Sequence, residues 1–570
     1  MRVVLCVLLV LWGCGGETTS QWQPELFCPN ATTGQCDAVK GATLRAGVAR
    51  RSVNPSCFEV YDDLNGNDKK ESEEPFWDCG CDRVCPGDAG YVAPDEGEGD
   101  GQFQAIWLAG FQQARAAKGV RGADRGLIGD TDGLMATATV LEQGNTRLAI
   151  VSVDGFGWMY EEVSDIRQQL AQGGAEIDHL MLHSTHSHAT PDTLGIYGKS
   201  ITSTGFNEAY AAQFRDTVVE VVEAAAVTLH PVAMRVGRID LSTTSEQGIL
   251  NYMSDTRDPF VVDPWLGAAH FYRVDTNAPV VTLVNWASHP EATSDSDSLM
   301  SADFVHGIRT AIEQGYEWDT ETIEPLGGLV VYLNGALGGM MTPLRIENED
   351  PDGVRRKDHS FEKADAIGLQ VGHHAMTALR EGTEVAAPAL SFRTQRLFLP
   401  IDNQAFQAMF LIGVLQREAY NYNPDDVLSD VNIPEIQTEL NLIDIGPVRM
   451  LTFPGEVLPE LTIGGYGGEH IHAEGVPLIQ PDNPNPPRLE NAPSGPYWKD
   501  ILDAEHAWIV GLANDQLGYI IPPYNYILHD TAPYVFEAEG DHYEETNSLG
   551  PRTAPLLDDV VQQLVGWSPE

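Results

Sequence analysis

Two histidines separated by one residue, His186 and His188, directly follow the apolar run 180–183 and stand just before Pro191. In α/β proteins ligands bind beyond the carboxyl ends of the strands, and imidazole is both a common metal ligand and a proton-transfer group near neutral pH. The spacing therefore predicts a site for metal or acid–base chemistry, with two loop histidines satisfied by neighbouring groups as the alternative.

Two further strand-like runs end in residues of the same kinds. The run 280–286 is followed by His289, and the run 448–453 is followed by Glu456. One sheet can bring such positions to a common edge although they are far apart in sequence. Two imidazoles and one carboxylate form the ligand set of hydrolytic zinc sites, which keep a position open for water. Each residue also has a structural explanation when it is considered alone. His289 could be a hydrogen-bonded histidine at a strand end, and Glu456 could be a turn residue.

The elements that must position these side chains are predicted from apolar patterns. Unalternating, β-branched-rich runs predict strands buried on both faces, at 148–153, 180–183, 280–286, 329–333, 448–453 and 507–512. Apolar residues at helical spacing predict helices at 161–171 and 207–226, the second with Asn207 available as N-cap. The sequence therefore predicts an α/β fold, with one large catalytic domain at 43–570 whose mixed sheet is flanked by helices.

Residues 1–13 predict a signal peptide, because Arg2 precedes an apolar run at 3–11 that is too short to span a bilayer. The run ends in Leu-Trp-Gly-Cys, which resembles a bacterial lipobox and makes Cys14 the predicted lipidation site. An ordinary cleaved signal peptide is the alternative. Residues 14–42 would form a tether and the start of a Cys-rich segment. We therefore expect an exported protein. It would be either lipid-anchored at the bacterial cell envelope, on the outer membrane, or secreted.

The charge of the chain excludes one class of partner. The 570 residues include 34 basic and 83 acidic side chains, a formal net charge of −49. A surface of this sign repels nucleic acid and anionic headgroups, so nucleic-acid binding is not expected. No segment after the signal peptide is apolar enough to be transmembrane, and the expected membrane contact is through the N-terminal lipid.

The remaining cysteines all lie in the first 85 residues, and they are Cys28, Cys36, Cys57, Cys79, Cys81 and Cys85. An even number in an exported chain predicts up to three disulfides, with the pairing left open. A cysteine zinc site is the alternative, but no Cys-x-x-Cys spacing supports it. Four of the six belong to an acidic insertion at 54–101.

This insertion contains a loop with the ligand spacing of a calcium site. Counted from its first aspartate, oxygen-bearing side chains occupy positions 1, 3, 5, 9 and 12 of an EF-hand-like loop. They are Asp63, Asn65, Asn67, Glu71 and Glu74. Position 6, usually glycine, is Asp68, and clear flanking helices are missing from the pattern. Calcium binding is thus one prediction, and a solvated acidic turn is the other.

Five segments resemble, in order, the motifs of the neutral/alkaline (non-lysosomal) ceramidase family. The segment 185–191 resembles its Thr-His-Thr-His-Ser-Gly-Pro motif, 285–289 with 299–303 its second histidine motif, 334–343 its Gly-Asp-Val-Ser-Pro loop, 453–456 its Pro-Gly-Glu motif, and 519–526 with 542–544 its closing tyrosine segments. The resemblance covers roughly residues 44–556.

The resemblance implies an exported zinc-dependent hydrolase that cleaves an N-acyl amide of a lipid-like substrate. It implies that His186, His289 and Glu456 bind zinc, with Tyr519 as the fourth ligand and Gln516 as the alternative occupant of that position.

The same resemblance implies which side chains act on the substrate. His188 would hydrogen-bond the scissile carbonyl or its oxyanion, and Thr342 stands where the family has the serine of its Gly-Asp-Val-Ser-Pro loop. Tyr526 or Tyr519 would donate to the developing oxyanion. Zinc would lower the pKa of a bound water, which attacks the amide carbonyl.

Three departures from the family pattern bear on the substrate more than on the metal. The loop 339–343 lacks the aspartate, Tyr252 stands in place of the arginine of Asn-Arg-Ser-Pro with Arg257 nearby, and the end of the sequence at Glu570 leaves no room for the family's immunoglobulin-like C-terminal domain. Zinc hydrolysis is therefore better supported than ceramide as substrate. The alternatives are a zinc esterase or other amidohydrolase on the same scaffold, and a metal-binding surface lipoprotein without turnover.

Overall fold

The computed structural model describes residues 26–27, 42–121, 133–318, 321–350 and 353–566, and its largest element is a nine-stranded mixed sheet. In order across the sheet the strands are β13 (Leu329–Asn334), β9 (Pro279–Trp286), β8 (Trp265–Arg273), β7 (His230–Asp240), β2 (Arg45–Ser52), β4 (Met135–Gln143), β5 (Thr146–Val153) and β6 (His179–Ser184), and β16 (Thr383–Val385) pairs with β7. Two pairs, β9 with β13 and β5 with β6, are parallel.

A second sheet packs against one face of the first. Its strands are β1 (Leu26–Phe27), β17 (Leu390–Pro400), β18 (Glu435–Ile445), β19 (Val448–Thr452) and β21 (His506–Val510). Because side chains alternate along a strand, Leu148 and Ile150 of β5 enter the core between the sheets, whereas Ala149 and Val151 face the helices. The predicted α/β fold is confirmed, and the last two predicted strands lie in this second sheet.

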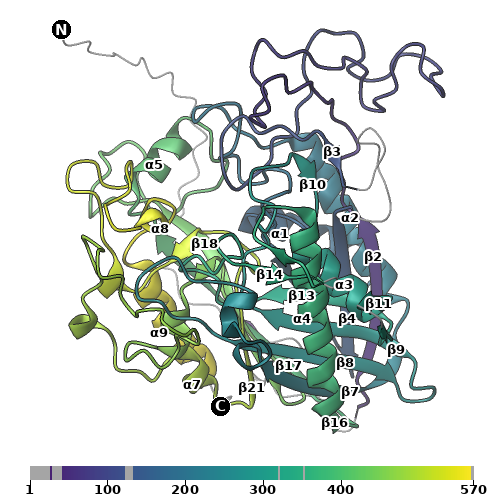
Figure 1. The fold of residues 1–570 in the computed structure, drawn as a ribbon, viewed down its shortest axis with the longest axis vertical. Helices are drawn as coiled ribbons and strands as arrows, with labels where there is room; N and C mark the ends of the chain where they lie inside the picture. The colour runs from purple at the N-terminus through teal and green to yellow at the C-terminus, as the bar shows by residue number, and fades with distance from the viewer. Residues whose placement is uncertain (1–25, 28–41, 122–132, 319–320, 351–352, 567–570) are drawn as a thin grey trace.

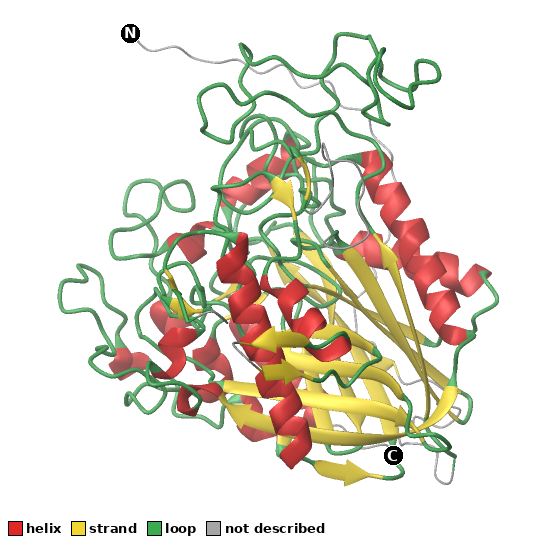
Figure 2. Cartoon of the chain, turned by 45° about the vertical axis from the view of Figure 1, so that its right-hand side comes forward, coloured by secondary structure: helices red, strands yellow, loops and turns green. Residues whose placement is uncertain are grey.

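Helices cover the outer faces of both sheets (Figures 1 and 2). On the nine-stranded sheet, α1 (Tyr160–Gln172) and α2 (Glu208–Ala226) pack over β4, β5 and β6, and α3 (Phe304–Glu313) and α4 (Phe361–Glu381) pack over β8, β9 and β13. The second sheet is covered by α7 (Trp498–Leu502) and α9 (Thr553–Gly566). The chain thus forms four layers, helix, sheet, sheet and helix, around its buried residues.

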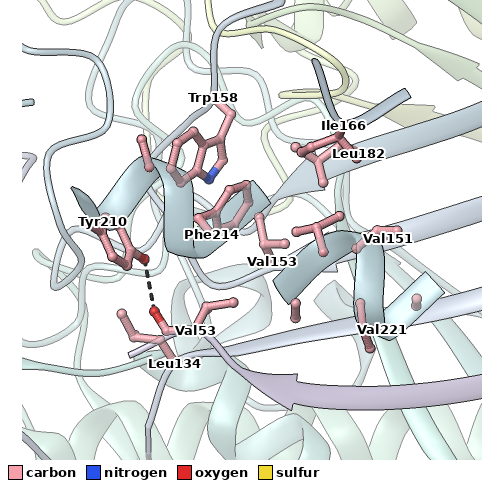
Figure 3. Close-up of a cluster of buried hydrophobic side chains, with 14 of the residues drawn as sticks. Val53, Leu134, Val151, Val153, Trp158, Ile166, Leu182, Tyr210, Phe214 and Val221 are labelled. Atoms are coloured by element: carbon pink, nitrogen blue, oxygen red, sulfur yellow. Dashed lines mark hydrogen bonds between the residues drawn. The ribbon is translucent and has the colours of Figure 1, made fainter. Parts of the chain in front are cut away.

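The core under α2 shows how sequence and packing agree. Asn207 caps the helix as predicted, since its side chain accepts a hydrogen bond from the Tyr210 N–H. The Tyr210 hydroxyl donates to the Val53 carbonyl at 3.0 Å, and the Trp158 ring stacks on Phe214 with centroids 3.7 Å apart (Figure 3). These contacts fix α2 against the residues that follow β2 and β5.

Short elements occupy the loops at the strand ends. They are β3 (Gly119–Val120), β10 (Leu299–Met300), β11 (Tyr316–Trp318), β12 (Glu321–Ile323), β14 (Asn348–Glu349), β15 (Arg355–Arg356), β20 (Glu456–Val457), β22 (Tyr519–Ile520), α5 (Gln404–Leu411), α6 (Pro459–Ile463) and α8 (Tyr543–Thr546). Among the helices that the structure describes, none is long and apolar enough to cross a bilayer.

The acidic insertion at 54–101 consists of loops, drawn in dark purple at the top of Figure 1. Two disulfides close it, Cys57–Cys81 and Cys79–Cys85. The predicted signal peptide, Cys14 and the other two cysteines lie outside the described residues.

The candidate calcium loop is folded around its first carboxylate. Asp63 accepts hydrogen bonds from the N–H groups of residues 66, 67 and 68, and Glu74 accepts from those of residues 64 and 71. The Lys118 ammonium lies 2.9 Å from Asp63 and 2.8 Å from Asp68. A protein cation therefore neutralises part of the loop, and calcium binding stays a prediction.

Candidate functional site

His186 is held in a fixed orientation just beyond β6. Its backbone is left-handed, with φ of 65°, and its N–H donates to the Gly155 carbonyl at 2.8 Å. Its Nδ1 lies 2.6 Å from the Phe156 carbonyl oxygen, and its ring stacks on Phe156 with centroids 4.4 Å apart. Since a carbonyl oxygen only accepts, Nδ1 carries the proton and Nε2 presents a lone pair.

His289 is arranged in the same way beyond β9. The side chain is fully buried, and its Nδ1 lies 2.9 Å from the Met341 carbonyl oxygen. The backbone N–H of His289 donates to the same carbonyl at 2.8 Å. Its Nε2 is therefore also free to bind a cation or a proton.

The Glu456 carboxylate lies next to both of these Nε2 atoms. It begins β20, which pairs in parallel with β22, and its Oε2 lies 3.4 Å from His186 Nε2 and 3.1 Å from His289 Nε2. Burial acts to raise the pKa of Glu456, but the two imidazoles hold that pKa well below its usual value. For His289 the effects are reversed: burial acts to lower its pKa, and the contact with Glu456 raises it. Two nitrogen lone pairs directed at one carboxylate oxygen are the arrangement that a shared cation stabilises.

His188 completes a group of three histidines whose ligand atoms lie within 4.8 Å of one another, the one such His, Cys, Asp or Glu group that the described residues form. Burial lowers the pKa of His188 well below its usual value, and the neighbouring His186 and His289 lower it further. Arg115 donates to the His188 carbonyl at 2.6 Å and fixes the backbone there.

Glu291 lies beside His188 and was missed by the sequence reasoning. Its Oε2 is 3.2 Å from His188 Nδ1, and it is 1% exposed. Burial raises the pKa of Glu291 to about 7, while His289 and the Thr342 hydroxyl act in the opposite direction. In the sequence, a carboxylate two residues after a strand-ending histidine is the signal that could have identified it.

The two candidates for the fourth metal position are placed differently. The Gln516 Nε2 donates to Glu456 Oε1 at 2.8 Å, so this side chain orients the carboxylate directly. The Tyr519 hydroxyl donates to Met340 Sδ at 3.1 Å. Burial raises the pKa of Tyr519 well above its usual value, and the charge of Glu456 raises it further.

The other two predicted catalytic side chains lie next to the site but are occupied by protein contacts. Thr342 Oγ1 accepts from the Leu344 N–H at 3.1 Å, and its backbone pairs with Ser254. The Tyr526 hydroxyl lies 2.8 Å from Ser548 Oγ.

We expect Gln516→Leu to weaken metal binding by about 10–100-fold, because side chains that orient a metal-binding carboxylate contribute on this scale. Tyr519→Phe, which removes only the hydroxyl on Met340, should change the affinity by less than about threefold. Competition between each variant and a zinc-sensitive dye measures both affinities. A larger loss in Tyr519→Phe than in Gln516→Leu would identify the tyrosine as the ligand.

An apolar pocket leads to the histidines. It is lined by His186, His188 and Glu456 together with the apolar side chains of Phe156, Met159, Leu194, Phe406, Phe410 and Leu549. Tyr543 of α8 also lines it, and the pKa of Tyr543 is raised by burial and by the charge of Glu456. The pocket therefore suits a ligand with a hydrocarbon chain next to a polar reacting group.

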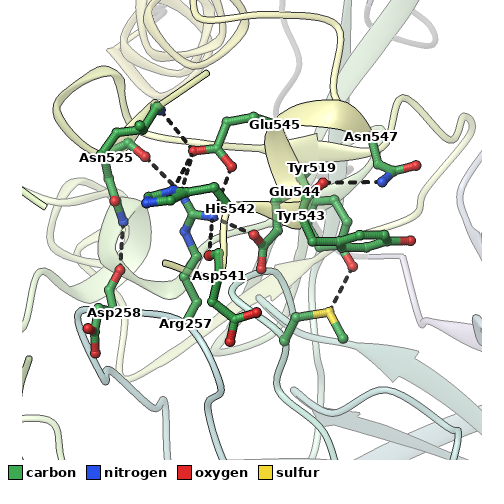
Figure 4. Close-up of polar contacts among 12 residues, drawn as sticks. Arg257, Asp258, Tyr519, Asn525, Asp541, His542, Tyr543, Glu544, Glu545 and Asn547 are labelled. Carbon is green, nitrogen blue, oxygen red and sulfur yellow. Dashed lines mark hydrogen bonds and ion pairs between the residues drawn. The ribbon is translucent and has the colours of Figure 1, made fainter. Parts of the chain in front are cut away.

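Arg257, the residue near the missing family arginine, does not reach this pocket as a free cation. Its guanidinium is buried, donates to Glu545 at 2.8 Å and to the Asn525 carbonyl at 2.7 Å, and also contacts Glu544 (Figure 4). Because both carboxylates belong to α8, the arginine anchors the helix that carries Tyr543. It acts on the pocket through that helix.

Comparison with known proteins gives a likeness in fold. No protein-family model matches the sequence, and no curated protein matches it in sequence. Among solved structures, neutral ceramidase from Pseudomonas aeruginosa is similar with a TM-score of 0.57 and 13% identity over 92% of this chain and 74% of that chain. A ceramidase complexed with C2 is similar with a TM-score of 0.56 and 13% identity over 92% of this chain and 75% of that one. The chain therefore has a ceramidase-like fold, and any function must be argued from its own residues.

Proposed function

We propose that this chain is an exported zinc-dependent amidohydrolase that cleaves a linear N-acyl amide of lipid-like character. The observation that carries the proposal is the convergence of His186 Nε2 and His289 Nε2 on one oxygen of Glu456, next to an apolar pocket that His186 and Glu456 help to line. The likeness in fold to neutral ceramidases supports the same reaction class.

The donor set fits zinc. Two neutral imidazoles and a carboxylate are the ligands that hydrolytic zinc sites use, and each imidazole here is oriented by a backbone carbonyl on its other nitrogen. His186, His289 and Glu456 would hold the ion, with Gln516 orienting Glu456. When bound, zinc would polarise the amide carbonyl and lower the pKa of water.

The remaining residues supply positioning and proton transfer. The His188 ring, next to Glu291 at 3.2 Å, is placed to accept the proton of the attacking water and to return it to the leaving amine. The apolar walls would hold the acyl chain and exclude bulk water, which strengthens every polar interaction at the site. Tyr543 is better placed than Tyr526 to donate to the oxyanion, because Tyr543 lines the pocket, whereas Tyr526 is not among the lining residues and its hydroxyl lies against Ser548.

Export and anchoring belong to the same proposal. The two disulfides support an oxidising compartment. The lipobox-like Cys14 would tether the enzyme to the bacterial envelope, at the outer membrane. Calcium at loop 63–74 would be a second, structural metal.

The test combines elemental analysis of the purified chain with hydrolysis of a fluorogenic N-acyl amide and of its matched ester. We expect about one zinc per chain and turnover of the amide that a chelator abolishes and zinc restores. Zinc with turnover of the ester alone would show an esterase, and zinc without any turnover would show a metal-binding protein. A chain that takes up no transition metal would refute the site.

A further inference from the structure

The helix α5 presents apolar side chains to solvent in a strongly acidic protein. No residue of α5 is buried, and at its C-terminal end Leu411 is 75% exposed and Ile412 is 61% exposed. No charged residue occurs from 404 to 416, although the chain has a net charge of −49. Exposed apolar patches of this kind mark surfaces that bind a partner or a membrane.

The inner face of α5 forms part of the pocket wall. Phe406 and Phe410 line the pocket, and with Leu415 they pack against Phe156, whose ring stacks on His186. Apolar surface therefore runs without interruption from the exposed end of α5 to a histidine of the site.

The position of α5 is fixed by its N-cap. Asn403 accepts from the N–H groups of Ala405 and Phe406, and its Nδ2 donates to the carbonyls of Thr546 and Ser548 at 3.1 and 2.9 Å. The helix is thereby tied to α8 and the residues after it, which contribute Tyr543, Asn547 and Leu549 to the pocket lining. The exposed side chains consequently stand at a defined place beside the pocket.

A second exposed apolar pair belongs to the loop that precedes α8. Val535 is 63% exposed and Phe536 is 62% exposed. These two side chains add to the exposed apolar surface of the chain.

We propose that the outer face of α5 docks on a zwitterionic lipid bilayer and delivers the substrate from the membrane into the pocket. A bilayer accepts a small, uncharged apolar surface without requiring the polar rim of a protein interface. The net charge of the chain opposes anionic headgroups, so the bilayer is a zwitterionic one. The reason to dock rests on the proposed function, whereas docking itself is measured without any reaction.

The test is flotation of the full chain with phosphatidylcholine vesicles, with Cys14→Ala in every sample so that no lipid anchor contributes. The double variant Leu411→Ser/Ile412→Ser is compared with Val227→Ser/Val274→Ser, whose valines are 85% and 55% exposed at the end of α2 and after β8. We expect the first pair to lower vesicle binding by at least about tenfold and the second to leave it unchanged.

Activity separates the docking surface from the site. With a short-chain amide in solution, Leu411→Ser/Ile412→Ser should hydrolyse at the rate of the parent chain, and with the same headgroup in vesicles it should be slower. Equal flotation of both double variants, or no flotation of the parent, would refute the proposal even if the enzyme is active. Concentration-dependent self-association that the α5 variant abolishes, without vesicle binding, would show instead that two copies meet at this face.

Discussion

Replacing His186 by alanine is expected to remove zinc and hydrolysis together, whereas replacing His188 is expected to leave zinc bound and to lower the rate. His186 Nε2 lies 3.4 Å from Glu456 Oε2, as expected for two atoms that would bind the same ion. The His186 Nδ1 is fixed by the Phe156 carbonyl. His188 instead has Nδ1 next to Glu291 at 3.2 Å. Proton transfer by a positioned side chain is worth about 10²–10⁴-fold in rate, and we expect a loss in this range for His188→Ala.

Elemental analysis and kcat of the two variants check this division. His373→Ala is the matched control, because this histidine lies on α4, away from the site. It should keep both zinc and rate. If His186→Ala and His188→Ala lose zinc to the same extent, all three histidines are ligands, as their mutual distances would also permit.

The sheet illustrates what local sequence patterns predict. The runs that became β5, β6, β9, β13, β19 and β21 are mostly apolar and do not alternate with polar residues, and this pattern predicts burial on both faces. Which strands share a sheet depends on pairing between segments that are distant in the sequence. Val448 pairs with His506 in one sheet, whereas Leu329 pairs with Val281 in the other, and no local signal distinguishes these partners.

The site was predicted where residue type and strand end coincide, and missed where only packing makes the contact. His186, His289 and Glu456 each follow a strand, so the sequence placed them at one edge, and they do come together. Glu291 was missed although it follows His289 by two residues, and Gln516 was named only as an alternative metal ligand. The contacts that these side chains make, with His188 and with Glu456, depend on long-range packing. A glutamine on a loop gives no chemical signal, although its amide is the group that holds Glu456.

Glu291→Gln is expected to lower kcat by about 10²-fold or more while zinc stays bound. A carboxylate next to an imidazole fixes the position of the ring proton and stabilises the imidazolium that forms when the ring accepts a proton. Both carboxylate oxygens of Glu291 and both ring nitrogens of His188 are buried and make no well-aligned hydrogen bond, and the Thr342 hydroxyl is a nearby polar group that acts on Glu291. The pair is thus poised to act on a reacting group rather than committed to a structural contact.

Glu460→Gln provides a matched control, because it makes the same chemical change at a carboxyl that is also buried. The pKa of Glu460 is likewise raised to about 7 by burial, but its charge partners are Arg257 and Glu544 instead of a histidine of the site. We expect its kcat to stay within about threefold of the parent, a range typical of changes outside a proton-transfer group. Steady-state kinetics with zinc analysis of both variants decides the matter. If Glu291→Gln loses zinc, the carboxylate is a ligand; if it keeps both zinc and rate, His188 works without it.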